Sequence, residues 1–374
     1  MRAVGIILAG GNNNRMKELT HKRAVAAMPI AGSYRSIDFA LSNMTNSHIQ
    51  KVAVLTQYNA RSLNEHLNSS KWWNFGRKQG GLYVFTPTIT NDNGYWYRGT
   101  ADAIYQNMDF LKKSHEPYVV IASGDAVYKM DYSKVLQYHI DKKADVTVVC
   151  KEMDPSDDVS RFGTIRMDDD MRITEFEEKP MVTKSNMIST GIYVIRRRLL
   201  IDLIEHAAEE ERFDFVNDVL IRYKNLKKIY GYKIDHYWSN IATVDAYYKT
   251  NMDFLKPEVR NYFFKQDPEI YSKVSDLPPA KYNPGASVKN SLVGSGSIIN
   301  GTVENSVIFK QVFVGNNCVI KNSIILNDVY LGDNTYIENC IVESRDTIRA
   351  NTAIGVDMQR KIILWVTNIQ TSSR

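Results

Sequence analysis

The first feature able to do chemistry is a glycine pair, Gly10 and Gly11, followed by an arginine at Arg15. The pair comes directly after a short apolar run, Val4–Leu8, of the kind that forms a buried strand. Glycines in such a turn let backbone N–H groups approach a phosphate, and the planar guanidinium of an arginine can bind phosphate oxygens. Ordinary strand-to-helix turns carry similar glycines, so this segment alone indicates phosphate binding only weakly.

Charged side chains able to bind a metal or a phosphate follow other parts of the chain. Asp125 comes shortly after the apolar run Tyr118–Ile121, and Glu178 and Lys179 end a charged segment. A carboxylate at the end of a strand can hold Mg²⁺, and a lysine can bind a phosphate as a point charge. Taken singly, Asp125 is better explained as a turn cap and Lys179 as a solvated surface residue.

An alternation of strand-like and helix-like segments positions these side chains. The apolar runs of strand length are Val4–Leu8, Val52–Thr56, Tyr118–Ile121, Ala144–Val149 and Gly191–Ile195. The segments with helical spacing between them include Ile37–Ser47, Ala101–Lys113 and Tyr132–Lys142. This alternation predicts an α/β fold with a mostly parallel, helix-covered sheet. Ligands of such sheets bind beyond the carboxyl ends of the strands.

The pattern of residue types changes towards the C-terminus. Residues 266–284 contain several prolines and little periodicity, which is typical of a linker. Beyond them, Val314-Gly315-Asn316-Asn317 returns as Leu331-Gly332-Asp333-Asn334. Such units predict a parallel β-solenoid in which Gly or Asn turns the corners at positive φ, with an antiparallel β-sandwich as the alternative. We therefore predict a large domain at 1–255, a linker at 256–284, and a β-helix domain with a C-terminal tail at 285–374.

Further motifs complete a set that resembles a known family. In chain order they are LAGG (8–11) with Arg15, SIDFALSN (36–43), TQY (56–58), WYRGTADA (96–103), GD (124–125), EEKP (177–180) and STGIYV (189–194). Together they resemble ADP-glucose pyrophosphorylase, also called glucose-1-phosphate adenylyltransferase, from about residue 3 to residue 355. The resemblance implies a Rossmann-like, GT-A-like nucleotidyltransferase domain followed by a left-handed parallel β-helix. It also implies the conversion of ATP and glucose 1-phosphate to ADP-glucose and pyrophosphate in glycogen biosynthesis.

The resemblance also implies roles for individual residues. Asp125 and Arg15 match catalytic positions, Asp125 as the carboxylate that holds Mg²⁺. Gln57 matches the adenine contact, and Lys179 matches the lysine that binds the sugar phosphate. The full set matching substrate-binding positions is Gly10, Gly11, Gln57, Tyr97, Gly99, Asp102, Glu178, Lys179, Ser189, Gly191 and Tyr193.

Three positions depart from the family pattern where the chemistry takes place. Asn13 replaces a glycine of the phosphate loop, Val25 replaces a lysine expected to neutralise the departing pyrophosphate, and Asn240 replaces a second metal-binding aspartate. If one preorganised charged group is worth about 10²–10³ in rate, losing two costs about 10⁴, although such losses need not add. We expect a weakened Mg²⁺ site.

These departures favour a regulatory, weakly active or inactive subunit, closest to the degenerate regulatory subunit of Firmicutes, in a mixed tetramer with a catalytic subunit. Sugar phosphates are candidate effectors, although Gly32-Ser33 stands where bacterial members usually carry an activator-linked lysine. One alternative is a competent stand-alone adenylyltransferase in which the Asn240 carbonyl binds Mg²⁺. A second alternative is a non-enzymatic sensor of sugar phosphates or nucleotides.

Composition excludes several other classes. The net charge of +5 is scattered, and the longest basic run is Arg196–Arg198, which argues against nucleic-acid binding. The three cysteines are far apart and lack CxxC spacing, which argues against a disulfide framework or zinc site and favours a reducing cytoplasm. No apolar run is long enough to span a membrane.

Overall fold

The computed structural model describes residues 2–11, 14–76, 80–89, 94–355 and 362–365. By spatial proximity the chain divides into two compact units. The first, called here the sheet unit, comprises Met1–Asn12 and Phe39–Trp238; the second, the helix-and-coil unit, comprises Asn13–Asp38 and Ser239–Arg374. The segment 256–284, predicted as a linker, contains a helix, α8 (Pro257–Phe264), and a short strand, β14 (Lys281–Tyr282).

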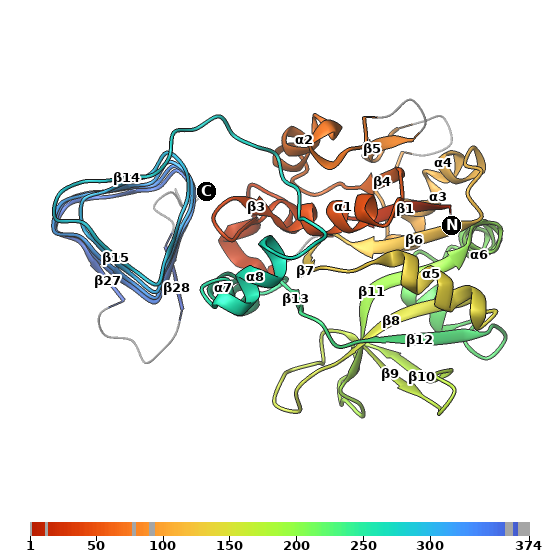
Figure 1. Cartoon of the computed structure of the whole chain (residues 1–374). Coiled ribbons are helices and arrows are strands. Elements are labelled where there is room, and N and C mark those ends of the chain that lie inside the picture. Colours follow the sequence, from red (N-terminus) through yellow and green to blue (C-terminus); the bar gives the residue numbers. More distant parts are fainter. Residues whose placement is uncertain (1, 12–13, 77–79, 90–93, 356–361, 366–374) are drawn as a thin grey trace, which may run out of the picture. The chain divides into compact units, whose positions relative to one another are not determined.

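A nine-stranded sheet forms the centre of the sheet unit (Figure 1). Its main path runs in the order β10-β9-β11-β6-β1-β4-β5, and β8 joins β11 to β12. The strands are β1 (Ala3–Leu8), β4 (Lys51–Leu55), β5 (Gly81–Phe85), β6 (Tyr118–Ser123), β8 (Val146–Glu152), β9 (Gly163–Met167), β10 (Ile173–Glu178), β11 (Met187–Arg196) and β12 (Ile229–Ile234). All five predicted apolar runs overlap strands, so the α/β class is confirmed.

The sheet is mixed. Strands β6, β1, β4 and β5 run parallel to one another, and β12 runs parallel to β8. Strand β11 is antiparallel to both of its long neighbours, β6 and β8. The parallel strands β1, β4 and β6 are buried along almost their whole length, which is why β1 is an uninterrupted apolar run rather than an alternating one.

Helices connect and cover these strands. Their bounds are α1 (Ser36–Asn46), α2 (Arg61–Leu67), α3 (Thr100–Tyr105), α4 (Met108–Lys112), α5 (Tyr132–Asp141) and α6 (Arg197–Glu209), with a 3-10 helix η3 (Ser70–Trp73) and a π-helix η4 (Phe215–Ile221). On α6 the buried residues Leu200, Leu203, Ile204 and Ala207 follow helical spacing, and they join the core formed by the sheet.

The predicted helix Ala101–Lys113 is in fact two helices, α3 and α4, separated at Asn107. The side-chain amide of Asn107 donates to the carbonyl of Ala103 at 2.9 Å and to the hydroxyl of Tyr97 at 2.9 Å. An asparagine that bonds locally in this way competes with the regular helical pattern. The break therefore holds Asn107 against Tyr97, a residue of the candidate site.

A buried histidine makes the stability of the sheet unit depend on pH. His139 lies on α5, its Nδ1 bonds the Thr147 hydroxyl at 2.9 Å, and its Nε2 has no partner among the residues that the structure describes. Burial, together with the charge of Arg196, lowers the pKa of His139 from 6.5 to about 4. Because the unfolded chain then binds a proton that the folded chain resists, stability is lost as the pH falls below 6.5.

We expect the wild-type chain to lose about 2 kcal/mol more unfolding free energy between pH 7 and pH 5 than a His139→Gln variant does. Urea denaturation of both chains at the two pH values measures this difference. Taking the difference between the chains removes the contribution of the carboxylates, which also titrate in acid. Equal losses in the two chains would show that His139 is protonated in the folded state.

The helix-and-coil unit contains three five-stranded parallel sheets that form the sides of a triangular coil (Figure 1). Their orders are β14-β17-β20-β23-β26, β15-β18-β21-β24-β27 and β16-β19-β22-β25-β28. The strands are β15 (Ser287–Lys289), β16 (Leu292–Val293), β17 (Ile298–Ile299), β18 (Thr302–Glu304), β19 (Val307–Ile308), β20 (Phe313–Val314), β21 (Val319–Lys321), β22 (Ile324–Ile325), β23 (Tyr330–Leu331), β24 (Tyr336–Glu338), β25 (Cys340–Val342), β26 (Thr347–Ile348), β27 (Ala353–Ile354) and β28 (Ile363–Trp365). The predicted β-helix is confirmed, and with it the left-handed parallel class.

Asparagines turn one corner of successive coils. Asn317, Asn334 and Asn351 have φ values of 55°, 58° and 61°, in the left-handed region. Their side-chain amides bond one another across 17 residues at 3.2 and 2.9 Å. The neighbouring Gly315 does not have positive φ; instead, a Cβ there would lie 2.8 Å from the backbone nitrogen of Asp333. In this repeat the asparagine supplies the turn and the glycine allows one coil to approach the next.

The helix-and-coil unit also contains chain segments that precede residue 39 and segments that follow residue 238. They are two 3-10 helices, η1 (Asn14–Thr20) and η2 (Val25–Ala27), a strand pair, β2 (Pro29–Ile30) and β3 (Tyr34–Arg35), and the helices α7 (Val244–Asp253) and α8. Helix α7 connects them, because Tyr247 donates to the carbonyl of Pro29 at 2.7 Å and Tyr248 to that of Asn322 at 2.5 Å. Across both units, no helix in the described ranges is long and apolar enough to cross a membrane.

Candidate active site

The carboxyl ends of three adjacent parallel strands bring the predicted chemistry of the sheet unit together. The backbone after β1 is fixed to both neighbours, because Ala9 N donates to Leu55 O at 2.8 Å and Gly124 N donates to Leu8 O at 3.0 Å. Gly10 and Gly11 therefore follow β1 between the ends of β4 and β6. A Cβ added to Gly11 would meet no described atom within 4 Å, so this turn has open space on its outer side.

Gln57, which follows β4, holds the segment that carries Tyr97. Its amide donates to the Tyr97 carbonyl at 3.2 Å, and its oxygen accepts from the Tyr97 N–H at 3.0 Å. The Tyr97 ring is buried, its hydroxyl accepts from Asn107 at 2.9 Å, and burial raises the pKa of that hydroxyl. The predicted adenine contact of Gln57 remains a prediction, and in this structure its amide fixes the position of Tyr97.

Asp102 is a buried carboxylate that holds neighbouring residues of the candidate site in place. It is only 2% exposed, and its carboxylate accepts from the Arg98 N–H at 2.8 Å, from the Arg98 guanidinium at 3.1 Å and from Gln106 at 2.9 Å. The guanidinium of Arg98 also lies 3.8 Å from the ring centre of Phe213. With its oxygens taken up in this way, Asp102 fixes the start of α3 rather than presenting a free carboxylate to a ligand.

Gly99 is required by the approach of Phe213. A Cβ at Gly99 would lie 2.7 Å from the Phe213 carbonyl carbon, while the N–H of Ala101 donates to the Phe213 oxygen at 2.8 Å. Because the obstacle is backbone, it cannot move aside as a side chain would. The role of Gly99 in this structure is to let the start of α3 pack against the segment before η4.

We expect Gly99→Ala to destabilise the protein by about 2–3 kcal/mol, because the added methyl overpacks against backbone. The matched control is Gly11→Ala, whose methyl enters open space and is expected to change the unfolding free energy by less than about 0.5 kcal/mol. Chemical denaturation of the two variants beside the wild type measures both values. If Gly99→Ala is as stable as the control, then the close approach to Phe213 is not maintained in solution.

Asp125 stands at the end of β6 with its carboxylate partly exposed. One carboxylate oxygen accepts from the hydroxyl of Ser123 at 2.5 Å, which orients the group. Next to it, β11 bulges between Ser189 and Tyr193, where Gly191 has a φ of 75° and a Cβ would lie 3.3 Å from the Ser123 side chain. The bulge thus brings the predicted wall residues beside Asp125.

Glu178 and Lys179 form an ion pair at 3.0 Å at the end of β10. The Glu178 side chain is 14% exposed and that of Lys179 is 61% exposed, so the lysine faces solvent while the glutamate lies beneath it. Lys179 has a φ of 46°, an uncommon conformation for a non-glycine residue and one that recurs at binding sites. Burial raises the pKa of Tyr193, its hydrogen bond to Ser189 at 3.2 Å lowers that pKa, and the nearby charge of Glu178 raises it further. These predicted residues therefore lie close together.

The remaining predicted residues lie outside this unit. Asn13 falls outside the residues that the structure describes, and Arg15 is an exposed residue of η1 in the helix-and-coil unit. Val25 begins η2 and is 7% exposed, so it is a core residue of its unit. The side-chain oxygen of Asn240 accepts from the N–H of Ala242 at 3.0 Å, which forms a local turn. An aspartate at this position could accept the same bond.

No group of three histidine, cysteine, aspartate or glutamate side chains within the described ranges could hold a metal by itself. A carboxylate such as Asp125 fits Mg²⁺ only if substrate phosphates supply further oxygens, which is the usual arrangement for this ion.

Three residues that shape the site were given no role of their own from the sequence. Ser123 orients Asp125, Phe213 packs against Gly99 and Arg98, and Asn107 holds the Tyr97 hydroxyl. Ser123 precedes the Gly-Asp pair and could have been found from that position. Phe213 and Asn107 carry no local motif, because their partners are brought to them only by the tertiary fold.

Comparison with known proteins agrees with this architecture. The sequence profile of the nucleotidyl transferase family matches residues 4–257, and that of the GlmU-like C-terminal hexapeptide family matches residues 278–365. A glucose-1-phosphate adenylyltransferase of Clostridium novyi is 40% identical over 320 residues, which cover 85% of this chain and 84% of that protein. One from Geobacillus stearothermophilus is 39% identical over 322 residues, covering 85% and 83% of the two chains.

A third relative matches to a similar extent. The glucose-1-phosphate adenylyltransferase of Thermosipho melanesiensis is 39% identical over 319 residues, 85% of this chain and 77% of that protein. Each match covers most of both chains, and the two profiles fall on the sheet with its flanking helices and on the β-helix. The chain therefore belongs to the ADP-glucose pyrophosphorylase, or glucose-1-phosphate adenylyltransferase, family of nucleotidyl transferases.

Proposed function

We propose that this chain is a regulatory subunit of glucose-1-phosphate adenylyltransferase, weakly active or inactive by itself, that works in a mixed tetramer with a catalytic subunit in the cytoplasm. Its task is to modulate the formation of ADP-glucose from ATP and glucose 1-phosphate for glycogen synthesis. Sugar phosphates are the proposed class of effector.

The observation that carries the proposal is the contrast between a retained binding frame and replaced charged groups. Gln57, Tyr97 and Gly99 are held by a connected set of contacts in the sheet unit. By contrast, Val25 is a buried apolar residue and Asn240 a neutral one. The frame of the sheet unit still suits binding, whereas losing the charges that the family carries at positions 25 and 240 removes much of the means of stabilising a transition state.

The chemistry of the family explains why these charges matter. A phosphate oxygen of glucose 1-phosphate attacks the α-phosphorus of ATP, and the bond from that phosphorus to the pyrophosphate oxygen breaks. Lys179 would hold the sugar phosphate, and Asp125 would hold Mg²⁺ together with phosphate oxygens. Mg²⁺, when bound, supplies charge neutralisation at the phosphates. Val25 would then offer no cation to balance the negative charge that builds up on the departing pyrophosphate, and Asn240 would offer Mg²⁺ no second carboxylate.

The test is to assay ADP-glucose formation by the purified chain alone and then after mixing with a catalytic glucose-1-phosphate adenylyltransferase. We expect little turnover alone, a mixed assembly by size-exclusion chromatography with mass determination, and changed activation of the partner by sugar phosphates. A rate for the chain alone that matches the catalytic protein would overturn the proposal. So would a partner whose assembly state and kinetics do not change on mixing.

A competent stand-alone enzyme is the second candidate, and the position of Asp125 favours it. This carboxylate is partly exposed and oriented by Ser123 at the carboxyl end of β6. That candidate predicts Mg²⁺-dependent turnover by the chain alone. A non-enzymatic sensor predicts binding of ATP or glucose 1-phosphate in a calorimeter, no turnover, and no assembly with a catalytic subunit.

A further inference from the structure

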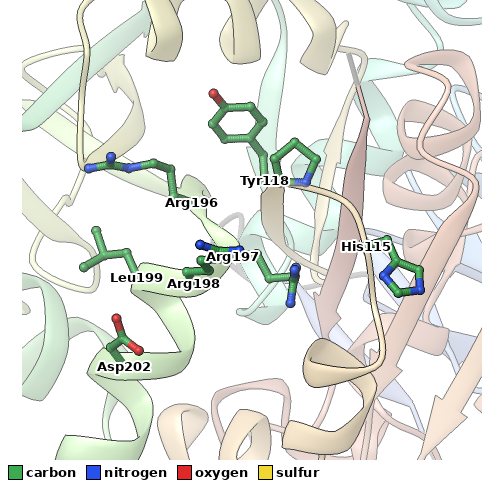
Figure 2. Close-up of a pocket in the computed structure, with 8 residues that line it drawn as sticks. His115, Tyr118, Arg196, Arg197, Arg198, Leu199 and Asp202 are labelled. Atoms are coloured by element: carbon green, nitrogen blue, oxygen red, sulfur yellow. The ribbon is translucent and has the colours of Figure 1, made fainter.

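A cavity of about 520 Å³ lies in the sheet unit, away from the candidate active site (Figure 2). It is lined by two segments: the approach to β6, with His115 and Tyr118, and the start of α6, with Arg196–Arg198 and Asp202. Tyr118 begins β6, whereas Asp125 comes just after the end of that strand. A strand of this length spans about 20 Å, so the cavity and the candidate site lie at opposite ends of the same strand.

The three arginines in this cavity differ in how they are bound. Arg197 is held in place, because its Nε donates to the Glu116 carbonyl at 2.8 Å and its Nη1 to the Leu111 carbonyl at 3.0 Å. Arg196 pairs with the carboxylate of Asp145. Arg198 has no hydrogen-bond or ion-pair partner within the described part of the chain. The guanidinium of Arg197 is thus preorganised, the charge of Arg196 is neutralised by Asp145, and the charge of Arg198 is exposed.

The start of α6 gives these charges no compensation of its own. Arg196 is the N-cap residue and makes no side-chain capping bond, and the first turn contains no acidic residue. The positive end of a helix disfavours nearby cations, and proteins usually place Asp or Glu there. The helix dipole therefore disfavours three consecutive arginines at this position, and a bound anion would offset that repulsion.

We propose that this cavity binds a small organic phosphate that also carries hydroxyl groups. Arg197 and Arg198 take the phosphate, since the forked guanidinium matches phosphate oxygens. The hydroxyl of Tyr118, which makes no hydrogen bond to the described residues, and the carboxylate of Asp202 bind hydroxyl groups of the ligand. The cavity volume suits a ligand of this size. The inference does not depend on whether the chain is catalytic or regulatory.

The test follows amide hydrogen exchange of the full chain, resolved by peptide, during titration with three probes at constant ionic strength. The probes are inorganic phosphate, glucose 6-phosphate and uncharged glucose. We expect saturable slowing of exchange in peptides covering 111–118 and 196–202 with both phosphates, stronger with glucose 6-phosphate, and none with glucose. No slowing there with either phosphate would overturn the proposal and leave the arginines as solvated surface charges.

Substitutions separate this site from the candidate active site. Arg198→Ala should weaken glucose 6-phosphate binding in these peptides about tenfold or more, because a charge-assisted contact is lost, and Arg198→Glu should abolish it. Arg198→Lys, which keeps the charge without the fork, should fall between wild type and Ala. Arg198 is exposed, so these changes leave the fold intact.

Two controls complete the design. Arg61→Ala removes the same charge from a side chain that is 92% exposed on α2, and it should leave the titration unchanged. Lys179→Ala removes the lysine of the candidate active site and should also leave it unchanged. If Lys179→Ala weakens the slowing as much as Arg198→Glu does, the phosphate binds at the candidate active site and the proposal fails. Unchanged binding in Arg198→Glu is equally incompatible with it.

Discussion

A chain carrying Asn13→Gly, Val25→Lys and Asn240→Asp together is expected to form ADP-glucose at least about 100-fold faster than the wild type, and up to about 10⁴-fold faster. The substitutions return the glycine of the phosphate loop, the cation expected to neutralise pyrophosphate and the second carboxylate for Mg²⁺. A steady-state assay with ATP, glucose 1-phosphate and Mg²⁺ measures the gain in kcat/KM.

The structure indicates how well Val25→Lys and Asn240→Asp are tolerated, whereas Asn13 lies outside the described residues. Asn240 accepts from Ala242 N through a side-chain oxygen, and an aspartate keeps that bond. Val25 is buried in its unit, so a lysine there must extend its amine to water or to a phosphate, and Val25→Met is the control for the added length alone. If the triple variant folds, as shown by an unchanged unfolding midpoint, and gains no activity, the defect does not lie at these positions.

Asp125→Ala is expected to lower any Mg²⁺-dependent turnover of the chain by about 10²–10³-fold, in the wild type and in the triple variant alike. Asp125 is the carboxylate that the proposed reaction uses to hold Mg²⁺. Among the described residues its carboxylate accepts a hydrogen bond from Ser123, on the same strand end, so its removal should change stability little. The assay is the same, carried out over a range of Mg²⁺ concentrations.

The matched control is Asp141→Ala, which removes an exposed carboxylate from the last turn of α5. Its rate and its Mg²⁺ dependence should equal those of the parent chain. A residual rate that Asp125→Ala leaves unchanged would mean that the turnover comes from a contaminating enzyme or from a site without Asp125.

The strands were predictable from sequence because buried parallel strands are continuous apolar runs, and β1 and β6 are of this kind. Strand direction was not predictable, because an apolar run such as Gly191–Ile195 can pair with its neighbours in parallel or antiparallel orientation. Its antiparallel pairing as β11 makes the mostly parallel sheet a mixed one in this region.

The other features that the sequence did not predict depend on tertiary contacts. The break between α3 and α4 depends on Asn107 bonding the hydroxyl of Tyr97, a partner ten residues earlier that no helical periodicity reveals. The sequence placed Asp102 in the pocket by its motif, but only the fold shows that Arg98 and Gln106 occupy its oxygens. In the β-helix, the Gly-Asx-Asx repeat was visible, while the assignment of the left-handed corner to the second Asx required the backbone.

The ladder of Asn317, Asn334 and Asn351 has a consequence for how this domain can change in length. Asn334 accepts from Asn317 in the coil before it and donates to Asn351 in the coil after it, so neighbouring coils meet in the same way at this corner. Removing 17 consecutive residues joins equivalent corners and restores the ladder, whereas removing a few residues displaces every later side chain from its face. The β-helix can therefore lengthen or shorten only by whole coils, and its size varies in discrete steps rather than continuously.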